Sequence, residues 1–272
     1  MKSGISNLRL SLFLVTSLVF SHQASAGGQE LQTSYRHSTL TQGLGDWNDW
    51  RLHWQRSDAE KNRLYVDYTN QNRFGVSDNN LAIGKHYYRS DALQYQAELT
   101  FSDTNTLFPA YSLLGAINTK LNPQTIFNTG FRHSHFRKQD AITKTVTEAD
   151  SEGLSARLEY YFGDSLLAYS LFYTLMQGPT LADNVVSNSL KYLYVYRRRS
   201  TIFISYASGG DIDYDRSTQL AISQIDSLSM GGSHWLSGTT ALVYTIANHQ
   251  VTGSGFDYQR NELYLGLRKL TR

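Results

Sequence analysis

The chain has 272 residues, with 25 Lys and Arg against 23 Asp and Glu, no cysteine and only three prolines. This near balance of charge gives no electrostatic reason to bind nucleic acid, and the lack of cysteine excludes a small fold held together by disulfides. Aromatic residues make up 13% of the chain, and 19 of them are tyrosines. Many aromatic residues and few prolines favour long, hydrogen-bonded β-strands.

The first 26 residues have the organisation of a secretory signal peptide. Lys2 and Arg9 supply a positive N-terminal region, residues 10–20 are an apolar run, and residues 24–26 (Ala-Ser-Ala) form a small-x-small cleavage site. The apolar run is shorter than the roughly 20 residues of a membrane-spanning helix, although a signal anchor is the alternative. We therefore expect residues 1–26 to be removed, which leaves residues 27–272 as one exported domain with no formal net charge.

Apolar and polar residues alternate with a period of two along much of this domain. In residues 166–175, for example, Leu167, Tyr169 and Leu171 lie on one face of a predicted strand, opposite Ala168 and Ser170. Such runs predict an all-β fold of about 14 strands, with 12 or 16 as alternatives. The predicted strands are 31–40, 47–56, 63–74, 79–89, 92–102, 110–121, 125–138, 152–162, 165–177, 187–198, 200–208, 217–235, 239–249 and 260–270.

The connections between the predicted strands alternate in length from the fourth strand onward. Short ones at 90–91, 122–124, 163–164, 199 and 236–238 alternate with long ones at 103–109, 139–151, 178–186, 209–216 and 250–259. Short periplasmic turns alternating with longer outer loops are typical of a transmembrane antiparallel β-barrel in the outer membrane of Gram-negative bacteria. The mean hydropathy of −0.40 fits such a barrel, whose lumen-facing residues are polar.

This fold predicts where the charged and aromatic side chains lie. A charge that faces lipid at the membrane midplane costs roughly 2–4 kcal/mol, so charged residues within strands should face the lumen. The predicted lumen-lining residues are Arg51, Asp67, Glu98, Arg132, Arg157, Glu159, Glu262 and Arg268. Aromatic residues near the periplasmic strand ends should form an interfacial girdle. The predicted girdle residues are Trp54, Tyr88, Tyr160, Phe162, Tyr196 and Trp235.

No motif in the sequence identifies a catalytic residue, and no cofactor is expected. Asp211, Asp213 and Asp215 resemble the start of a calcium loop, but Arg216 and Ile222 stand where an EF-hand needs Gly and Glu. A looser cation site in an outer loop is an alternative, and a polar loop is the default interpretation. His133-x-His135 supplies two imidazoles on one face of a strand, which is one protein ligand short of a catalytic zinc site.

Two segments resemble the YaiO family of outer-membrane barrels. Residues 121–132 (LNPQTIFNTGFR) are a tight turn followed by an aromatic-rich strand with a glycine and an aromatic-Arg pair, and residues 208–215 (SGGDIDYD) lead from glycines into Tyr-Asp. The resemblance implies an outer-membrane barrel without an established activity. The chain ends in Leu270-Thr271-Arg272, whereas such barrels usually end in an aromatic residue that helps the insertion machinery.

Three functions follow as hypotheses. The first is a porin-like channel or an export channel for saccharide or exopolysaccharide, because Tyr- and Trp-rich walls with paired charges suit sugar faces and hydroxyls. The second is a structural or surface-interaction barrel with a plugged lumen, and the third is an outer-membrane hydrolase acting on lipid or glycan. The expected partners are outer-membrane lipid, lipopolysaccharide, the barrel assembly machinery and a saccharide.

Overall fold

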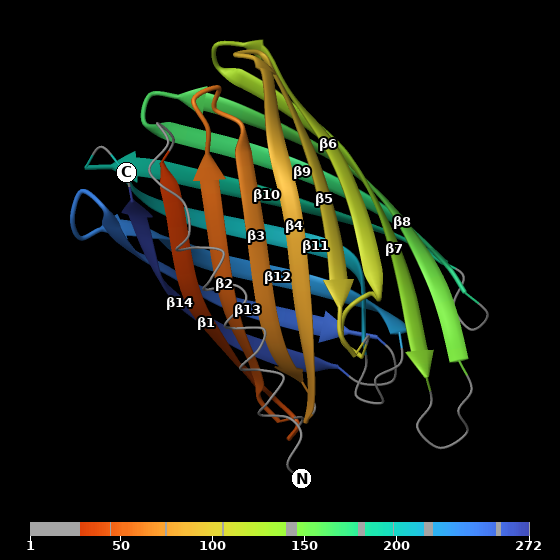
Figure 1. Ribbon diagram of the computed structural model, residues 1–272. Coiled ribbons are helices and arrows are strands. Elements are labelled where there is room, and N and C mark those ends of the chain that lie inside the picture. Colours follow the sequence, from red (N-terminus) through yellow and green to blue (C-terminus); the bar gives the residue numbers. More distant parts are fainter. Residues whose placement is uncertain are drawn as a thin grey trace.

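The computed structural model describes residues 28–43, 45–73, 75–104, 106–139, 146–178, 183–197, 199–214, 220–253 and 257–271, so the predicted signal peptide lies outside the described residues. Within these ranges, fourteen antiparallel strands form one closed barrel (Figure 1). No helix in them is long and apolar enough to cross a membrane. The strands are β1 (Gln29–Leu40), β2 (Trp47–Ser57), β3 (Arg63–Arg73), β4 (Val76–Ser90), β5 (Leu93–Ser102), β6 (Tyr111–Asn122), β7 (Thr125–Gln139), β8 (Val146–Phe162), β9 (Ser165–Gln177), β10 (Asp183–Tyr196), β11 (Ser200–Tyr214), β12 (Leu220–Trp235), β13 (Thr240–Thr252) and β14 (Tyr258–Thr271).

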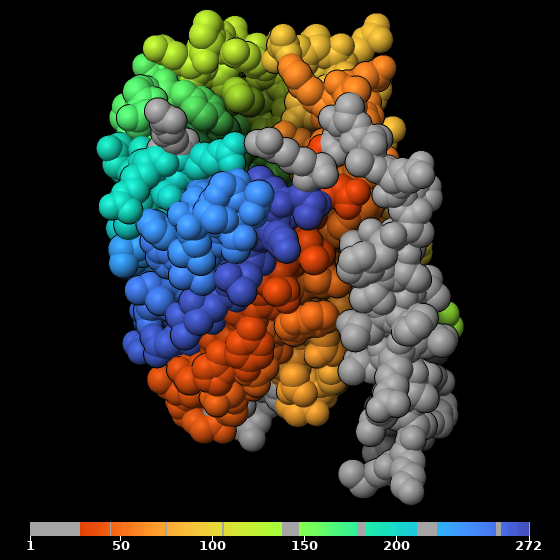
Figure 2. Space-filling view, turned by 60° about the vertical axis from the view of Figure 1, so that its left-hand side comes forward, coloured from red at the N-terminus to blue at the C-terminus, as the bar shows by residue number. Residues whose placement is uncertain are grey.

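The barrel closes because its first and last strands pair along their whole length. The register of β1 against β14 runs from Gln29 opposite Thr271 to Leu40 opposite Arg260. Figure 2 shows this seam as a dark blue band of β14 against the red band of β1, both oblique to the long axis of the barrel. Closure leaves neither strand with an unpaired edge. A sheet can lie in lipid only when all of its backbone groups are paired in this way.

The predicted all-β barrel of 14 strands is confirmed, but several predicted connections are too long. Connections after the even-numbered strands are short and lie at one end of the barrel, here called the turn end; those after the odd-numbered strands lie at the loop end (Figure 1). The predicted loop 139–151 is wrong in its second half, because β8 begins at Val146. The predicted loop 209–216 is likewise wrong, because β11 continues to Tyr214.

The two faces of the wall have opposite chemistry. Residues paired across antiparallel strands lie on the same face of the sheet. Following the pairs from strand to strand therefore identifies the inward and outward positions around the whole barrel. Outward positions include Leu113, Leu154 and Leu228, which are about half exposed. Inward positions include the buried Ser34 and Asp67. An apolar outer face around a polar interior is the pattern of a barrel surrounded by lipid.

The outward face becomes polar near the loop end. Asn70 donates a hydrogen bond of 2.9 Å to Asn79, and the Asn79 amide donates one of 2.6 Å to Asp103. On β7 and β8, the outward His135 lies 2.8 Å from an oxygen of Asp150. Since such groups are not stable in hydrocarbon, the strands extend beyond the lipid layer at this end.

Two glycines allow close approaches that a larger residue would prevent. Gly209 in β11 has a φ of +141°, and a Cβ there would lie 2.3 Å from the Cα of Ser187. The predicted glycine turn at 208–210 is therefore a tightly packed part of the strand. A Cβ on Gly84 in β4 would lie 2.2 Å from the ring of Tyr65, so this glycine lets the ring lie flat over the neighbouring strand.

Candidate functional site in the lumen

The inward face of the barrel carries charged side chains of both signs that pair with one another. The register and the ion pairs place on this face all eight residues of the predicted lumen set: Arg51, Asp67, Glu98, Arg132, Arg157, Glu159, Glu262 and Arg268. None of the eight is alone. The contacts form clusters around Asp67, around Glu98 and at the seam between β14 and β1, together with the pair of Arg157 and Glu159 on β8.

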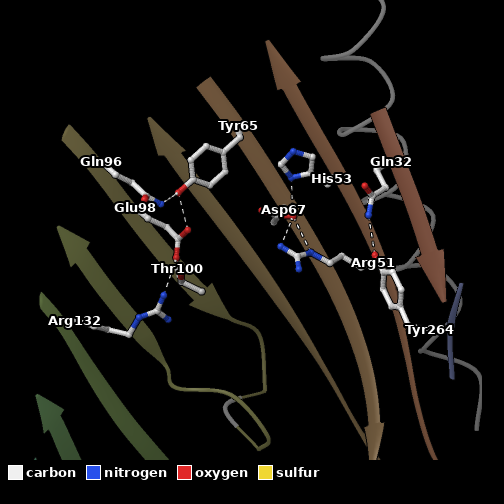
Figure 3. A network of polar contacts seen from close by, with 10 residues as sticks. All are labelled: Gln32, Arg51, His53, Tyr65, Asp67, Gln96, Glu98, Thr100, Arg132 and Tyr264. Carbon is white, nitrogen blue, oxygen red and sulfur yellow. Dashed lines mark hydrogen bonds and ion pairs between the residues drawn. The ribbon is translucent and has the colours of Figure 1, made fainter. Parts of the chain in front are cut away.

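The first cluster surrounds Asp67 on β3. Arg51 on β2 donates to a carboxylate oxygen of Asp67 through Nε at 2.9 Å and lies 2.8 Å from the same oxygen through a terminal nitrogen. His53 lies 3.0 Å from that oxygen through Nδ1. Asp67 is buried, so the guanidinium of Arg51 compensates the charge of the carboxylate and the imidazole of His53 adds a hydrogen bond to it (Figure 3).

The second cluster surrounds Glu98 on β5. The Tyr65 hydroxyl donates to Glu98 at 2.7 Å and accepts a bond of 2.9 Å from the Gln96 amide. Arg132 on β7 reaches the other oxygen of Glu98 at 3.4 Å, as Thr100 also does (Figure 3). The short bond from Tyr65 is the strong contact here, and the guanidinium of Arg132 is held only at the limit of hydrogen bonding.

The seam between β14 and β1 carries the third cluster. Arg268 donates to Gln32 at 3.0 Å and lies 3.1 Å from Glu30. Arg36 pairs with Asp49 and lies 3.6 Å from Glu262. These pairs join the last strand to the first two on the lumen side, so they stabilise the closed barrel as well as lining it.

Water reaches the middle of the lumen. The side chain of Arg51 is 52% exposed, that of Arg132 48% and that of Arg157 40%, although all three lie inside a closed barrel. The opposite wall leaves this space open because its inward side chains are small. On β10 to β13 these small inward residues include Ser187, Ser189, Ser205, Ala207, Ser229, Gly231, Thr245 and Ala247.

The loop end of the lumen is packed instead. Trp47 is only 4% exposed and lies between two guanidinium groups, with Arg73 at 4.4 Å and Arg260 at 5.1 Å from its ring. Met176 on β9 and Val251 on β13 are also buried at this end. The described inward side chains thus leave the lumen wide in the middle and narrow toward the loops.

One buried carboxylate holds the β5–β6 loop at this narrow end. Asp78 is fully buried and faces inward on β4. It accepts backbone hydrogen bonds from Thr106 at 2.7 Å, Leu107 at 2.8 Å and Phe108 at 3.2 Å, together with bonds from Thr104 and Ser102. Leu107 is 5% exposed. Because the inward carboxylate of Asp78 binds the backbone of the loop, the loop bends inward over the mouth of the lumen.

Comparison with known proteins identifies the family. Residues 28–210, more than half of the chain, match the YaiO membrane beta barrel domain. The chain belongs to the YaiO family. It is an outer-membrane β-barrel protein, and β12 to β14, which lie beyond the matched residues, complete the closed wall. No curated protein matches the chain.

Several solved barrels resemble this YaiO-family structure. The CymD monoaromatic hydrocarbon channel has a TM-score of 0.61 at 11% identity, over 91% of this chain and 89% of its own. The toluene transporter TodX of Pseudomonas putida has a TM-score of 0.57 at 10% identity, over 91% and 90%. An anion-selective porin from Comamonas acidovorans has a TM-score of 0.51 at 11% identity, over 91% and 100%. At these identities the likeness shows the shared fold alone.

The six predicted girdle residues of the YaiO-family barrel divide between the two faces. Trp54, Tyr160, Phe162 and Tyr196 occupy outward positions near the turn end. The register pairs Tyr88 with Gln94, which places Tyr88 on the inward face, next to a bulge in β4. Trp235 also has inward register, opposite Ala241, and its indole donates to the Arg199 carbonyl of the neighbouring turn.

The predicted metal candidates form no site among the described residues, which contain no group of three ligands able to hold a metal ion. His133 and His135 lie on the outward face, where both contact Asp150 and stack near Tyr111. Asp211 and Asp213 belong to β11, and their side chains, like all of Asp215, lie outside what the structure describes. The weak cation site remains a prediction.

Several residues of the lumen clusters were not predicted from the sequence. His53 bonds to Asp67, Tyr65 bonds to Glu98, and Gln96 bonds to Tyr65. The same two-residue period identifies them, because each is separated from a predicted residue of its own strand by an even number of positions. Asp78 is harder to find, since its partners lie in a loop.

Proposed function

We propose that this outer-membrane barrel is a water-filled channel for small hydrophilic solutes, with saccharides as the main class. The observation that carries the proposal is the exposure of Arg51, Arg132 and Arg157 inside a closed wall. Arginine side chains that keep nearly half of their surface in water mark a wet interior of a size that side chains do not fill. A channel of this kind would also serve to export an exopolysaccharide, which is a longer substrate of the same chemistry.

The chemistry of the wall favours polar cargo. The names of the similar barrels include both hydrocarbon channels and an anion-selective porin, so the fold alone is compatible with either kind of solute. An apolar solute passing the clusters around Asp67 and Glu98 would replace water without replacing its hydrogen bonds. Hydroxyl-rich solutes replace those bonds, so ion-paired walls suit saccharides better.

The pairing of both signs predicts weak charge selectivity. Among the residues that the structure describes, charges of opposite sign lie side by side rather than in a ring of one sign: Arg157 is 2.8 Å from Glu159, and Arg51 is 2.8 Å from Asp67. In planar bilayers, the purified barrel should conduct ions with a reversal potential near zero in a salt gradient. Arg157→Glu places two carboxylates together, so the channel should become cation-selective. The ratio of cation to anion permeability, calculated from the reversal potential, should rise a few-fold.

Arg137→Glu is the matched control for this measurement. Arg137 lies 3.5 Å from Glu148 on the outward face of β7, so reversing its charge changes the net charge equally without changing the lumen. An equal shift in both variants contradicts an assignment of Arg157 to the conducting path. Silence from folded wild-type protein favours the second hypothesis, a structural barrel closed at its packed loop end.

A second candidate function, ester hydrolysis, is favoured by three inward side chains on adjacent strands. Ser227 Oγ lies 2.7 Å from Nδ1 of His249, and Nε2 of His249 lies 3.8 Å from a carboxylate oxygen of Glu262. The first distance suits a nucleophile and its base; the second is longer than a hydrogen bond. The group faces the lumen, so its substrate would be an acylated saccharide rather than membrane lipid.

In this candidate reaction, Ser227 Oγ forms a bond to the acyl carbon while its proton moves to His249 Nδ1. The ester bond between the acyl carbon and the sugar oxygen then breaks, and the proton passes to that oxygen. Water attacks the acyl-serine with His249 taking its proton, the bond between the acyl carbon and Ser227 Oγ breaks, and the proton returns to Oγ as the acid leaves. Incubation of the folded barrel with an acetylated saccharide should release acetate, and Ser227→Ala should abolish the release. Ser229→Ala, two residues along the same face, is the control. Equal rates in wild type and Ser227→Ala exclude this activity.

A further inference from the structure

A recess of about 370 Å³ lies in the lumen wall between β5 and β9. Most of its lining comes from two neighbouring rungs of the register, and Asn128, Phe131 and Leu154 complete it. One rung joins Gln96, Ala116, Gly130, Ser155 and Phe172, and the next contains Leu114, Arg132, Gly153 and Thr174. The volume is near the lower end of the roughly 300–1,000 Å³ of typical ligand pockets, which is suited to one or two small rings.

The recess exists because the centre of both rungs lacks large side chains. Gly130 and Gly153 are inward residues on adjacent strands, Gly130 between Ala116 and Ser155 and Gly153 between Arg132 and Thr174. A Cβ on Gly153 would have its nearest neighbour, Thr174 Oγ1, at 3.7 Å, so a side chain there would begin in ordinary van der Waals contact. Arg132 stands on one side of the depression and Phe172 on the other.

Phe172 is an unusual residue for this wall. Its register with Ser155 and Ser187 places it on the inward face, yet it is 43% exposed. An aromatic ring left in the water of a polar lumen loses the hydrophobic stabilisation that burial would provide. A flat apolar surface of this kind can be covered by the C–H face of a sugar ring, while the sugar hydroxyls stay in contact with water and polar groups.

The polar groups around the recess match such a ring. Gln96, Asn128, Ser155 and Thr174 offer both donors and acceptors, as vicinal hydroxyls require. Arg132 offers donors only, and its recorded contact is the 3.4 Å one to Glu98, which itself is held more closely by Tyr65. No carboxylate lines the recess. The site therefore favours a ligand that bears hydroxyls and one negative charge.

We propose that this recess is a binding subsite for a single sugar ring that carries a carboxylate, a hexuronate, on the path through the lumen. The carboxylate pairs with Arg132, the ring packs on Phe172, and the hydroxyls bond the amides and hydroxyls between them. The subsite rests on the proposed channel function, because the ligand must enter through the lumen.

The test uses the full-length folded barrel and D-glucuronate as the probe, with D-glucose and benzoate for comparison. Binding is measured by calorimetry in detergent, and block of the ion current is measured in planar bilayers. Glucuronate should bind saturably and block the current, and glucose should bind about 10- to 100-fold more weakly for lack of the charge-assisted contact. Tighter binding of benzoate than of glucuronate overturns the assignment to a sugar.

Paired variants separate the recess from the rest of the lumen. Arg132→Gln should reduce glucuronate affinity to that for glucose, whereas Arg51→Gln, which removes an equally exposed lumen charge outside the recess, should leave it within about twofold. Gly153→Leu should fill the recess and abolish binding of both sugars. Gly115→Leu is its control, since Gly115 has outward register on β6 and open space around it.

The outcomes also separate the subsite from the channel. A barrel that conducts but neither binds glucuronate nor is blocked by it overturns the subsite and leaves the channel standing. Saturable binding that is lost in Arg132→Gln, in a barrel that does not conduct, overturns the channel and supports the subsite. Equal losses of affinity in Arg132→Gln and Arg51→Gln show attraction by the general field of the lumen and overturn the role of the recess.

Discussion

Leu228→Arg is expected to destabilise the barrel by roughly 2–4 kcal/mol, while Ser229→Arg, one residue further along β12, should cost far less. Leu228 is 55% exposed on the outward face and lies at the middle of the strand, where an arginine would face hydrocarbon. Ser229 faces the lumen between Ser205 and Ala247, whose small side chains leave room for a guanidinium in water.

The measurement is unfolding by urea in lipid vesicles, followed by heat-modifiable mobility on gels. The expected loss in Leu228→Arg corresponds to a roughly 30- to 1,000-fold fall in the ratio of folded to unfolded protein. Leu228→Met is the control, because it changes the side chain without adding a charge. The stability of this variant in urea should remain near that of the wild type. Equal losses for the arginines at 228 and 229 show that the assignment of the two faces is wrong.

Asp78→Ala is expected to release the β5–β6 loop and widen the mouth of the lumen. The substitution removes the acceptor of backbone hydrogen bonds from Thr106, Leu107 and Phe108. Bonds to a charged acceptor contribute about 1.5–3 kcal/mol each, so without Asp78 the loop loses these three stabilising bonds to β4. Single-channel conductance should rise severalfold, and a protease should cut within 103–110 in intact vesicles.

Asp103→Ala is the matched control for the loop. Asp103 belongs to the same loop, but its carboxylate is exposed and accepts its two bonds from Asn79 on β4 rather than from Thr106, Leu107 or Phe108. Its removal should leave conductance and protease resistance close to wild type. If Asp78→Ala is folded, uncut and unchanged in conductance, the loop is held by contacts other than this carboxylate, and it does not narrow the conducting path.

Much of the membrane-embedded part of the fold could be predicted from the sequence. Lipid and lumen impose opposite chemistry on alternate residues, so Leu167, Tyr169 and Leu171 show their outward face in the sequence itself. The same period placed Arg51 and Glu98 inward, because a charge is not stable on the other side. The prediction was wrong where this contrast ends: residues 146–151 and 209–214 continue their strands beyond the alternating segments, because backbone pairing goes on without the alternation.

Two of the six predicted girdle residues, Tyr88 and Trp235, have inward register. Tyr88 keeps the two-residue period of Ala82 and Gly84 up to the bulge that follows it, so its neighbour Tyr87 takes the outward position. Trp235 is the last residue of its strand and bonds to a turn that precedes the neighbouring strand. The sequence of either segment alone contains no sign of these contacts.

The sequence by itself thus determined the class of fold, a strand number of about 14 with 12 or 16 left open, and the charges expected in the lumen, because each depends on a local pattern repeated along the chain. Only the tertiary structure decided which residues meet. The recess between Arg132 and Phe172, the loop held by Asp78 and the group Ser227, His249 and Glu262 all join residues of different strands or loops. Their contacts depend on strand register and barrel closure, and a shift of one residue would turn a whole strand's inward set toward lipid.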